Sequence, residues 1–240
     1  MTSSSSLLGS RGLLLPPAEA YGWADSLKYY QGAFGAGRSV HGTVRLVGRL
    51  RSAIDATHRI IACHERTGGV LYGYRLVSGN AANSISAYSG GAGGYVETPR
   101  YTFSGGDIGK IFVLHLVTDT VARLYIGGAE VGSGTAPVTV TDAGITGRLT
   151  LGMYIDGGFS SSPIGILNIS VSPTALTAAQ VVVDATTIMS RPRGLILPLM
   201  PGEDQRHVAD DVLQVSSWVD RLGSVTLTET GDVSVSRVPV

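Results

Sequence analysis

The sequence is short of charge, and the charge that it has is balanced. Charged residues make up 15% of the 240 positions, and Lys+Arg and Asp+Glu number 18 each. A typical globular domain carries about 25% charged residues. A neutral chain offers no electrostatic surface for nucleic acid or for an anionic membrane. We therefore expect no nucleic acid and no membrane insertion among its interactions.

Cysteine and long hydrophobic runs are scarce as well. Cys63 is the only cysteine, which excludes an intrachain disulfide, and its apolar neighbours predict a buried, inert thiol. No run approaches the ~18 apolar residues of a membrane-spanning helix. Residues 1–6 contain no basic residue and Arg11 interrupts the apolar stretch that follows, so no export signal is predicted. The expectation is a protein made in the cytoplasm and then assembled into something larger.

Glycine and alternating apolar residues, by contrast, are abundant. The 33 glycines include runs such as residues 89–94, which are typical of turns or loop tips. The clearest segment, residues 109–131, predicts three strands joined by tight turns. Strands of this spacing indicate a two-sheet sandwich. The strands expected in the central region are 42–50, 58–66, 70–77, 111–117, 121–126, 129–131, 148–155 and 164–171.

A single helix is predicted over residues 178–188. Thr177 can cap its first turn, and Gln180, three residues later, can complete a capping box. The Val and Thr residues of the segment give it only modest helix propensity. Packing against a sheet must therefore hold this helix in place.

Four short patterns follow one another at a consistent spacing. Residues 123–131 are similar to an LYVDGxxV hairpin, with Gly127 in place of the usual Asp. Residues 148–152, 165–171 and 175–181 are similar to the two strands and the helix start that follow such a hairpin. Together the four patterns resemble the laminin-G-like, or concanavalin A-like, jelly-roll domains over roughly residues 39–190. The resemblance implies an all-β, two-sheet antiparallel jelly-roll sandwich with one short helix and N- and C-terminal extensions.

The resemblance divides the chain into three parts. Residues 1–38 form an N-terminal arm, residues 39–190 the jelly roll and residues 191–240 a tail with two expected strands. Within the tail, residues 215–223 resemble a VxxWxDxxG segment that precedes the core in bacterial and phage members. Here the segment follows the core. The tail either closes the chain's own sandwich, which we favour because two unpaired strands are marginal alone, or is completed by another chain.

The sequence carries little that indicates catalysis or metal binding. In a regular strand His58 and His64 lie on one face and Cys63 on the other, so they cannot form a tetrahedral site without a bulge. His115 lies in an apolar strand and is interpreted as a packed, hydrogen-bonded histidine. No GxSxG, HExxH or phosphate-binding glycine loop is present, nor the ExDxxE carboxylates of jelly-roll glycoside hydrolases. We expect no enzyme activity, no cofactor and no metal.

Tyrosines in the glycine-rich middle of the chain are the candidate binding residues. Tyr88, Tyr95 and Tyr101 fall within residues 88–107, which are expected to form an exposed loop or a short hairpin at the rim of the sandwich. Tyrosine gives rigid amphipathic contact area for a glycan or for a neighbouring subunit. The alternative is that these rings belong to the sheets or to an apolar layer.

The hypothesis from the sequence is a non-enzymatic structural or adhesion protein of a phage-like particle. It would be a capsid decoration, head-fibre or tail component of the virion, homo-oligomeric, with other virion subunits or cell-surface glycans as partners. A free bacterial carbohydrate-binding module is the alternative, and a glycoside hydrolase-like enzyme is the least favoured one. A self-contained module would use its terminal segments within its own fold, whereas a virion protein would commit them to neighbouring subunits.

Overall fold

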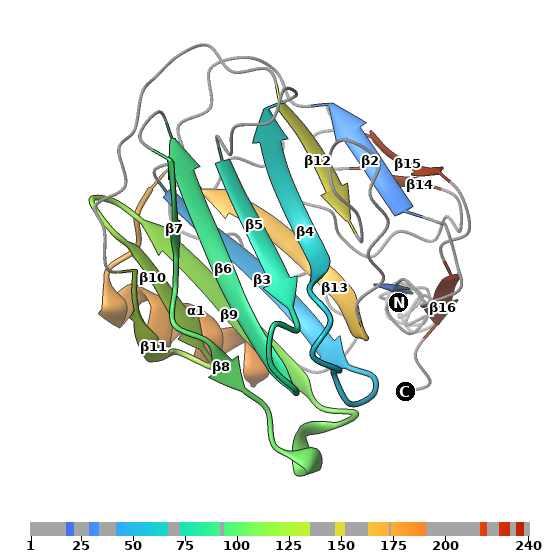
Figure 1. The fold of residues 1–240 in the computed structure, drawn as a ribbon, viewed down its shortest axis with the longest axis horizontal. Coiled ribbons are helices and arrows are strands. Elements are labelled where there is room, and N and C mark those ends of the chain that lie inside the picture. Colours follow the sequence, from blue (N-terminus) through green and yellow to red (C-terminus); the bar gives the residue numbers. More distant parts are fainter. Residues whose placement is uncertain are drawn as a thin grey trace, which may run out of the picture.

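Two antiparallel β-sheets stack face to face, and an α-helix lies on the outer face of one of them (Figure 1). The computed structural model describes residues 18–21, 29–33, 42–66, 73–91, 94–134, 147–151, 163–172, 174–190, 217–219, 226–230 and 234–237. Strands dominate these residues, and α1 is the one α-helix among them. The predicted two-sheet antiparallel sandwich with one short helix is thereby confirmed.

Sheet A has seven strands, in the order β11-β10-β9-β3-β13-β1-β16. They are β1 (Ala18–Tyr21), β3 (Gly42–Leu50), β9 (Ile111–Thr118), β10 (Ala122–Ile126), β11 (Ala129–Ser133), β13 (Ile164–Ser172) and β16 (Ser234–Arg237). Strands β9, β10 and β11 form the predicted meander. Its second turn contains Gly127 and Gly128 with φ of 59° and 89°. Glycine adopts these angles without strain, so the turn forms without the Asp of the LYVDGxxV pattern.

Sheet B has nine strands, in the order β14-β15-β2-β12-β4-β5-β6-β7, with β8 also paired to β6. They are β2 (Tyr29–Ala33), β4 (Arg59–Arg66), β5 (Gly73–Ser78), β6 (Ser84–Gly91), β7 (Gly94–Glu97), β8 (Tyr101–Thr102), β12 (Gly147–Leu151), β14 (Ser217–Val219) and β15 (Thr226–Thr230). A short 3-10 helix, Gly105–Asp107, follows β8. The strands come from all three predicted parts of the chain.

The first and last strands pair within the same sandwich as the central ones. In sheet A, β1 lies between β13 and β16, with Ala18 opposite Arg237. In sheet B, β2 lies between β12 and β15. The described strands of residues 1–38 and 191–240 therefore extend both sheets of their own chain, and the sheets cross the boundaries predicted at residues 38 and 190.

An apolar core fills the space between the two sheets. The buried residues of this core are Val44, Leu46, Leu50, Ile54, Ile61, Ala62, Tyr74, Leu76, Ile85, Ala87, Val96, Phe103, Phe112, Leu114, Leu116, Ala122, Leu124, Ile164, Ile166 and Ile169. Most alternate along their strands, as the period-two pattern of the sequence requires. Each large side chain removed from water contributes about 1.5–3 kcal/mol. This layer fixes which face of each strand points inward.

A β-bulge in β4 changes the faces that the sequence predicted. Ile60 pairs with Val77 and Ala62 with Leu76, so Ile61 is an extra residue without a partner position on β5. Ile61 and Ala62 both face the core, whereas Ile60 and Cys63 pack together on the outer face of sheet B. His58 lies on that outer face too, with its ring 6.2 Å from Tyr88. The prediction that His58 and Cys63 lie on opposite faces is therefore wrong, because a bulge shifts the alternation by one residue.

Helix α1 (Ala178–Met189) starts where the sequence predicted. Thr177 accepts a hydrogen bond from the Gln180 backbone N–H, and the Gln180 side chain accepts one from the Thr177 backbone N–H. This capping box satisfies two backbone donors of the first turn. The helix packs on the outer face of sheet A through two apolar clusters. They contain Val47, Val113, Ala185 and Ile188, and Val117, Tyr125, Leu176 and Val181.

A buried ionic network lies between these two apolar clusters. Arg45 on β3 donates to both carboxylate oxygens of Asp184 on α1, at 3.0 and 3.3 Å, and to Ser170 Oγ on β13 at 3.0 Å. His115 on β9 contacts the same carboxylate, with 2.8 Å between Nε2 and Oδ2. Ser170, Arg45 and His115 are direct cross-strand neighbours, and all three side chains are fully buried. The interpretation of His115 as a packed, hydrogen-bonded histidine is confirmed.

The network holds His115 in its neutral form. Burial lowers the pKa of His115, the Asp184 carboxylate opposes this effect, and the Arg45 guanidinium lowers the pKa further. Neutral His115 donates from Nε2 to Asp184, which leaves Nδ1 as a bare acceptor. Nδ1 is buried and has no hydrogen-bond partner among the described residues. A second proton would bind to Nδ1, where no described residue offers a hydrogen-bond acceptor.

We predict that Asp184→Asn lowers the free energy of unfolding by about 3–5 kcal/mol, because it leaves the Arg45 charge buried without its counter-ion. Urea denaturation measures this loss. The matched control is Asp119→Asn, which removes the charge from the exposed Asp119–Arg123 pair and should cost no more than about 1 kcal/mol. The double variant Arg45→Met/Asp184→Leu should recover most of the loss. Equal losses in the two single variants would contradict this account.

We also predict that the protein loses stability as the pH falls through about 6.5, the ordinary pKa of histidine. Between the lowered pKa of His115 and 6.5, the unfolded chain binds more protons than the folded one, so acid favours unfolding. Denaturation midpoints at a series of pH values should show this slope, and His115→Gln should flatten it. His58→Gln serves as the comparison: the pKa of His58 is lowered as well, so each variant should remove its own part of the slope and leave the other part in place. An unchanged slope in His115→Gln would refute the assignment.

Candidate functional site

The three candidate tyrosines lie on strands rather than in a loop. Residues 88–107 continue β6, form β7 and β8 and end in the 3-10 helix, with β6 and β7 paired as a hairpin at the edge of sheet B. Tyr88 is on β6 and is 9% exposed, and Tyr95 is on β7 and is 63% exposed. The short hairpin at the rim, one of the two forms expected from the sequence, is what the described residues show.

Tyr101 is separated from the other two rings by the sheet itself. It pairs with Ile85, whose side chain belongs to the core between the sheets. Its ring packs edge-on against Phe103, with 5.1 Å between the centroids, and lies against the core cluster. The structure therefore does not bring Tyr101 together with Tyr88 and Tyr95, because register places it on the inner face.

Tyr88 and Tyr95 meet on the outer face of sheet B. Their centroids are 5.4 Å apart in an edge-to-face arrangement, and Tyr88 is itself anchored among Ile60, Cys63 and Val77. Gly90 is the residue opposite Tyr95 on β6. Because glycine has no side chain, nothing on β6 covers the Tyr95 ring at that position. The result is an exposed aromatic ring that packs against a buried one.

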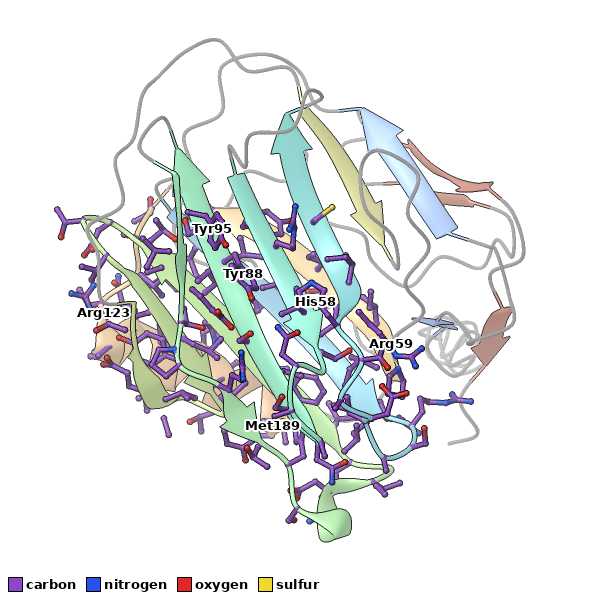
Figure 2. The ribbon with its side chains drawn as sticks, in the orientation of Figure 1. His58, Arg59, Tyr88, Tyr95, Arg123 and Met189 are labelled. Carbon is purple, nitrogen blue, oxygen red and sulfur yellow. The ribbon has the colours of Figure 1, made fainter. Side chains whose placement is uncertain are left out.

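Polar side chains extend this surface towards the turn between β5 and β6. His58 Nδ1 lies 3.1 Å from Asn80 Oδ1, and Asn80 Nδ2 donates to Tyr88 Oη at 3.4 Å. Figure 2 shows Tyr95, Tyr88 and His58 in line across the outer face. Partial burial lowers the pKa of His58 despite its bond to Asn80, so the ring is neutral near pH 7. No sequence pattern indicated this part of the surface, since it depends on the bulge in β4 and on the turn at Asn80.

A charged pair lies beside Tyr95. Glu97 follows Tyr95 by two residues on β7 and so shares its face, and its Oε1 accepts from Arg100 at 3.5 Å and from Ser86 Oγ at 3.3 Å. The side chains of Glu97 and Arg100 are 33% and 42% exposed. Burial, reinforced by the Glu97 carboxylate, raises the pKa of Tyr88 to about 12. The phenol therefore stays protonated at physiological pH.

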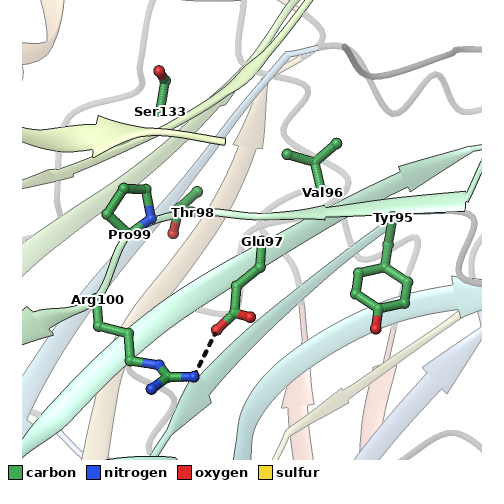
Figure 3. A pocket seen from close by; sticks show the side chains of 7 residues that line it. All are labelled: Tyr95, Val96, Glu97, Thr98, Pro99, Arg100 and Ser133. Carbon is green, nitrogen blue, oxygen red and sulfur yellow. Dashed lines mark hydrogen bonds and ion pairs between the residues drawn. The ribbon is translucent and has the colours of Figure 1, made fainter. Parts of the chain in front are cut away.

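An open depression of about 590 Å³ joins these residues at the side of the sandwich. Tyr95, Val96, Glu97, Thr98, Pro99, Arg100 and Ser133 line it (Figure 3). The volume falls within the ~300–1,000 Å³ usual for small-molecule sites. The depression wraps around β7, the edge strand of sheet B, and reaches Ser133 at the end of β11, the edge strand of sheet A. We call Tyr88, Tyr95, Glu97 and Arg100, with this depression, the Tyr95 site.

Two glycines let the edges of the two sheets approach each other at this site. A Cβ on Gly134 would collide with the Val96 side chain, and one on Gly132 would lie 2.8 Å from Pro99 Cγ. Gly132 also has a φ of 151°, which L side chains rarely adopt. The close contacts of Gly132 with Pro99 and of Gly134 with Val96 therefore define the rim of the depression. A larger residue at either glycine would clash with these side chains.

The chemistry available at the Tyr95 site is that of binding. It offers an aromatic face, a carboxylate and a guanidinium, all reachable from solvent. The His115–Asp184 pair, which has the residue types of an acid–base couple, is sealed beneath α1 and cannot reach a substrate. Within the described ranges, no group of three or more His, Cys, Asp or Glu residues is placed to hold a metal ion. No described helix is both long and apolar enough to cross a membrane.

Comparison with known proteins gives matches in structure and none in sequence. No family model matches the chain, and no curated protein matches it. A candidate carbohydrate-binding protein from Bacteroides ovatus is similar over 94% of this chain and 61% of its own, with 12% identity and a TM-score of 0.57. The heptameric SAP-like pentraxin from Limulus polyphemus is similar over 81% of this chain and 94% of its own, with 16% identity and a TM-score of 0.51.

The receptor-binding domain of botulinum neurotoxin D is a third structural neighbour. The similarity covers 73% of this chain and 45% of that one, with 12% identity and a TM-score of 0.51. The chain thus spans less than two thirds of the length of two of these three proteins. At identities this low the likeness concerns the fold. The chain has the jelly-roll, lectin-like fold of these domains.

Proposed function

We propose that the chain is a non-enzymatic carbohydrate-binding domain that holds glycans at the Tyr95 site. The observation that carries the proposal is the Tyr95 ring, 63% exposed at the rim of a depression and packed in an edge-to-face contact with Tyr88. An exposed aromatic face stacks on the C–H face of a sugar ring. The neighbouring carboxylate and guanidinium supply the acceptor and the donors that sugar hydroxyls need.

Rigidity favours binding at this site. Tyrosine has only two side-chain torsions to restrict, and the edge contact with Tyr88 already limits both. Less conformational entropy is therefore lost when a ligand orders the ring. The polar row of Asn80 and His58 fixes Tyr88 in turn. These residues support the contact surface without having to touch the ligand.

The structural neighbours support the same class of function. One is described as a candidate carbohydrate-binding protein and another is a receptor-binding domain. The use of the terminal strands inside the chain's own sheets supports a self-contained binding module. Both observations suit a domain that recognises a surface.

The setting that we propose is the virion of a phage-like particle, as an adhesion or decoration protein made in the host cytoplasm. Its support is the sequence alone, namely the likeness of residues 215–223 to bacterial and phage jelly-roll proteins. A single stacked sugar gives weak binding, and repeated copies would supply avidity. Light scattering on the purified chain should then give the mass of a symmetric homo-oligomer. A monomeric mass would refute the oligomer and leave the self-contained module.

For the binding function, we predict that Tyr95→Ala lowers affinity for the best ligand on a glycan array at least about tenfold, the equivalent of 1.4 kcal/mol. The free energy of unfolding should change by less than about 1.5 kcal/mol, because the ring is exposed and loses mainly its edge contact with Tyr88. Array binding followed by titration calorimetry measures the first effect, and urea denaturation the second.

The matched control is Tyr101→Ala, the same substitution on the inner face. It should lower stability by about 2 kcal/mol or more, because it opens a cavity beside Phe103, while affinity per folded molecule stays unchanged. Absence of binding to every glycan, or equal binding by wild type and Tyr95→Ala, would sink the proposal.

A further inference from the structure

The charges at the Tyr95 site cancel. Glu97 and Arg100 form the one ion pair among the residues that line the depression, and both are partly exposed. Tyr88, behind them, remains an uncharged phenol. A ligand that reaches the Tyr95 ring along β7 therefore meets one carboxylate and one guanidinium that neutralise each other, rather than a cationic pocket.

The hydrogen-bonding capacity of the pair is only partly used. Arg100 and Ser86 both donate to Glu97 Oε1, and the Tyr88 phenol also hydrogen-bonds to this carboxylate. A carboxylate has about four acceptor positions, so capacity remains for a ligand hydroxyl. Arg100 donates through Nη2 alone, so its Nη1 and Nε donors are not used by described residues. A free acceptor and free donors thus lie side by side.

This pattern matches two adjacent hydroxyl groups of a sugar. One hydroxyl donates to the Glu97 carboxylate while its neighbour accepts from Arg100, and this two-point arrangement favours one orientation of the sugar. Glu97 follows Tyr95 on the same face of β7 at a spacing of about 7 Å, so one ring can stack on Tyr95 while its edge or the next ring reaches the pair.

The same arrangement disfavours acidic sugars. A carboxylated sugar at this place would bring a second carboxylate next to Glu97, and like charges brought together raise the free energy of the complex. Arg100 cannot offset this fully, because its charge is already shared with Glu97. Building on the proposed function, we propose that the Tyr95 site binds neutral sugars with adjacent hydroxyl groups and discriminates against acidic ones.

The test compares neutral with acidic polysaccharides by affinity electrophoresis. Dextran and galactomannan are the neutral probes, and polygalacturonate and polysialic acid the acidic ones. The wild type should be retarded by at least one neutral probe and not by the acidic ones. Periodate, which cleaves the bond between carbons that bear adjacent hydroxyls, should abolish retardation by that probe.

Two variants assign the selectivity to the ion pair. Glu97→Gln keeps the size of the side chain but weakens its acceptor, so it should lower affinity for the neutral probe about tenfold and remove the discrimination against polygalacturonate. Arg100→Met should lower neutral binding to a similar extent. Arg123→Met, on the exposed Asp119–Arg123 pair of β10, is the matched control and should bind as the wild type does.

The outcomes separate this inference from the function on which it rests. Binding to acidic probes by the wild type, or undiminished neutral binding by both Glu97→Gln and Arg100→Met, would overturn the neutral-sugar assignment while carbohydrate binding stands. Persistence of binding after periodate treatment would overturn it as well. Absence of retardation by every probe, with the fold intact by circular dichroism, would remove the proposed function itself.

Discussion

The buried ion pair between Arg45 and Asp184 fixes how the helix and sheet A fit together. A guanidinium removed from water at the centre of a sheet costs several kcal/mol unless a counter-ion and further acceptors surround it. Among the described residues, the carboxylate that pairs with Arg45 comes from α1, so this pair fixes the position of the helix on the sheet. Thr43, two residues earlier on β3, accepts from the Leu176 backbone N–H and donates to the Thr174 carbonyl, which anchors the approach to the helix. The polar side chains on the outer face of β3 thus determine where α1 packs on sheet A.

Local patterns made much of this fold predictable. The period-two run of β3, the glycine turns of the β9–β11 meander and the capping box of α1 depend on residues close in sequence, and the structure has all three. The burial of Arg45 could not be predicted from the sequence. Alternating arginines in a strand are typical of a solvent-exposed face, and only the structure shows that a helix covers them. The bulge at Ile61 escaped prediction because it is defined by the partner strand as much as by β4 itself.

The candidate site likewise has features that the sequence predicts and features that only the structure shows. Tyr95 and Tyr101 look alike in the sequence, both aromatic residues in a glycine-rich region between apolar strands. Their difference comes from register: Tyr101 pairs with an inward-facing residue of β6, whereas Tyr95 faces Gly90. A shift of one position would exchange their roles. Asn80 and His58 join the surface only through a turn and a bulge, so no linear pattern could have indicated them.

The interleaving of the first and last strands has a consequence for how the protein is made. Because β1 lies between β13 and β16, and β2 between β12 and β15, neither sheet can reach its final order until the C-terminal strands have been synthesised. Pairing Ala18 with Arg237 closes a loop that contains almost the entire chain, which slows folding. A nascent chain on the ribosome therefore carries β1 and β2 with open edges, the condition in which strands pair with the wrong neighbours. The N-terminal strands therefore keep open edges until β15 and β16 have been synthesised.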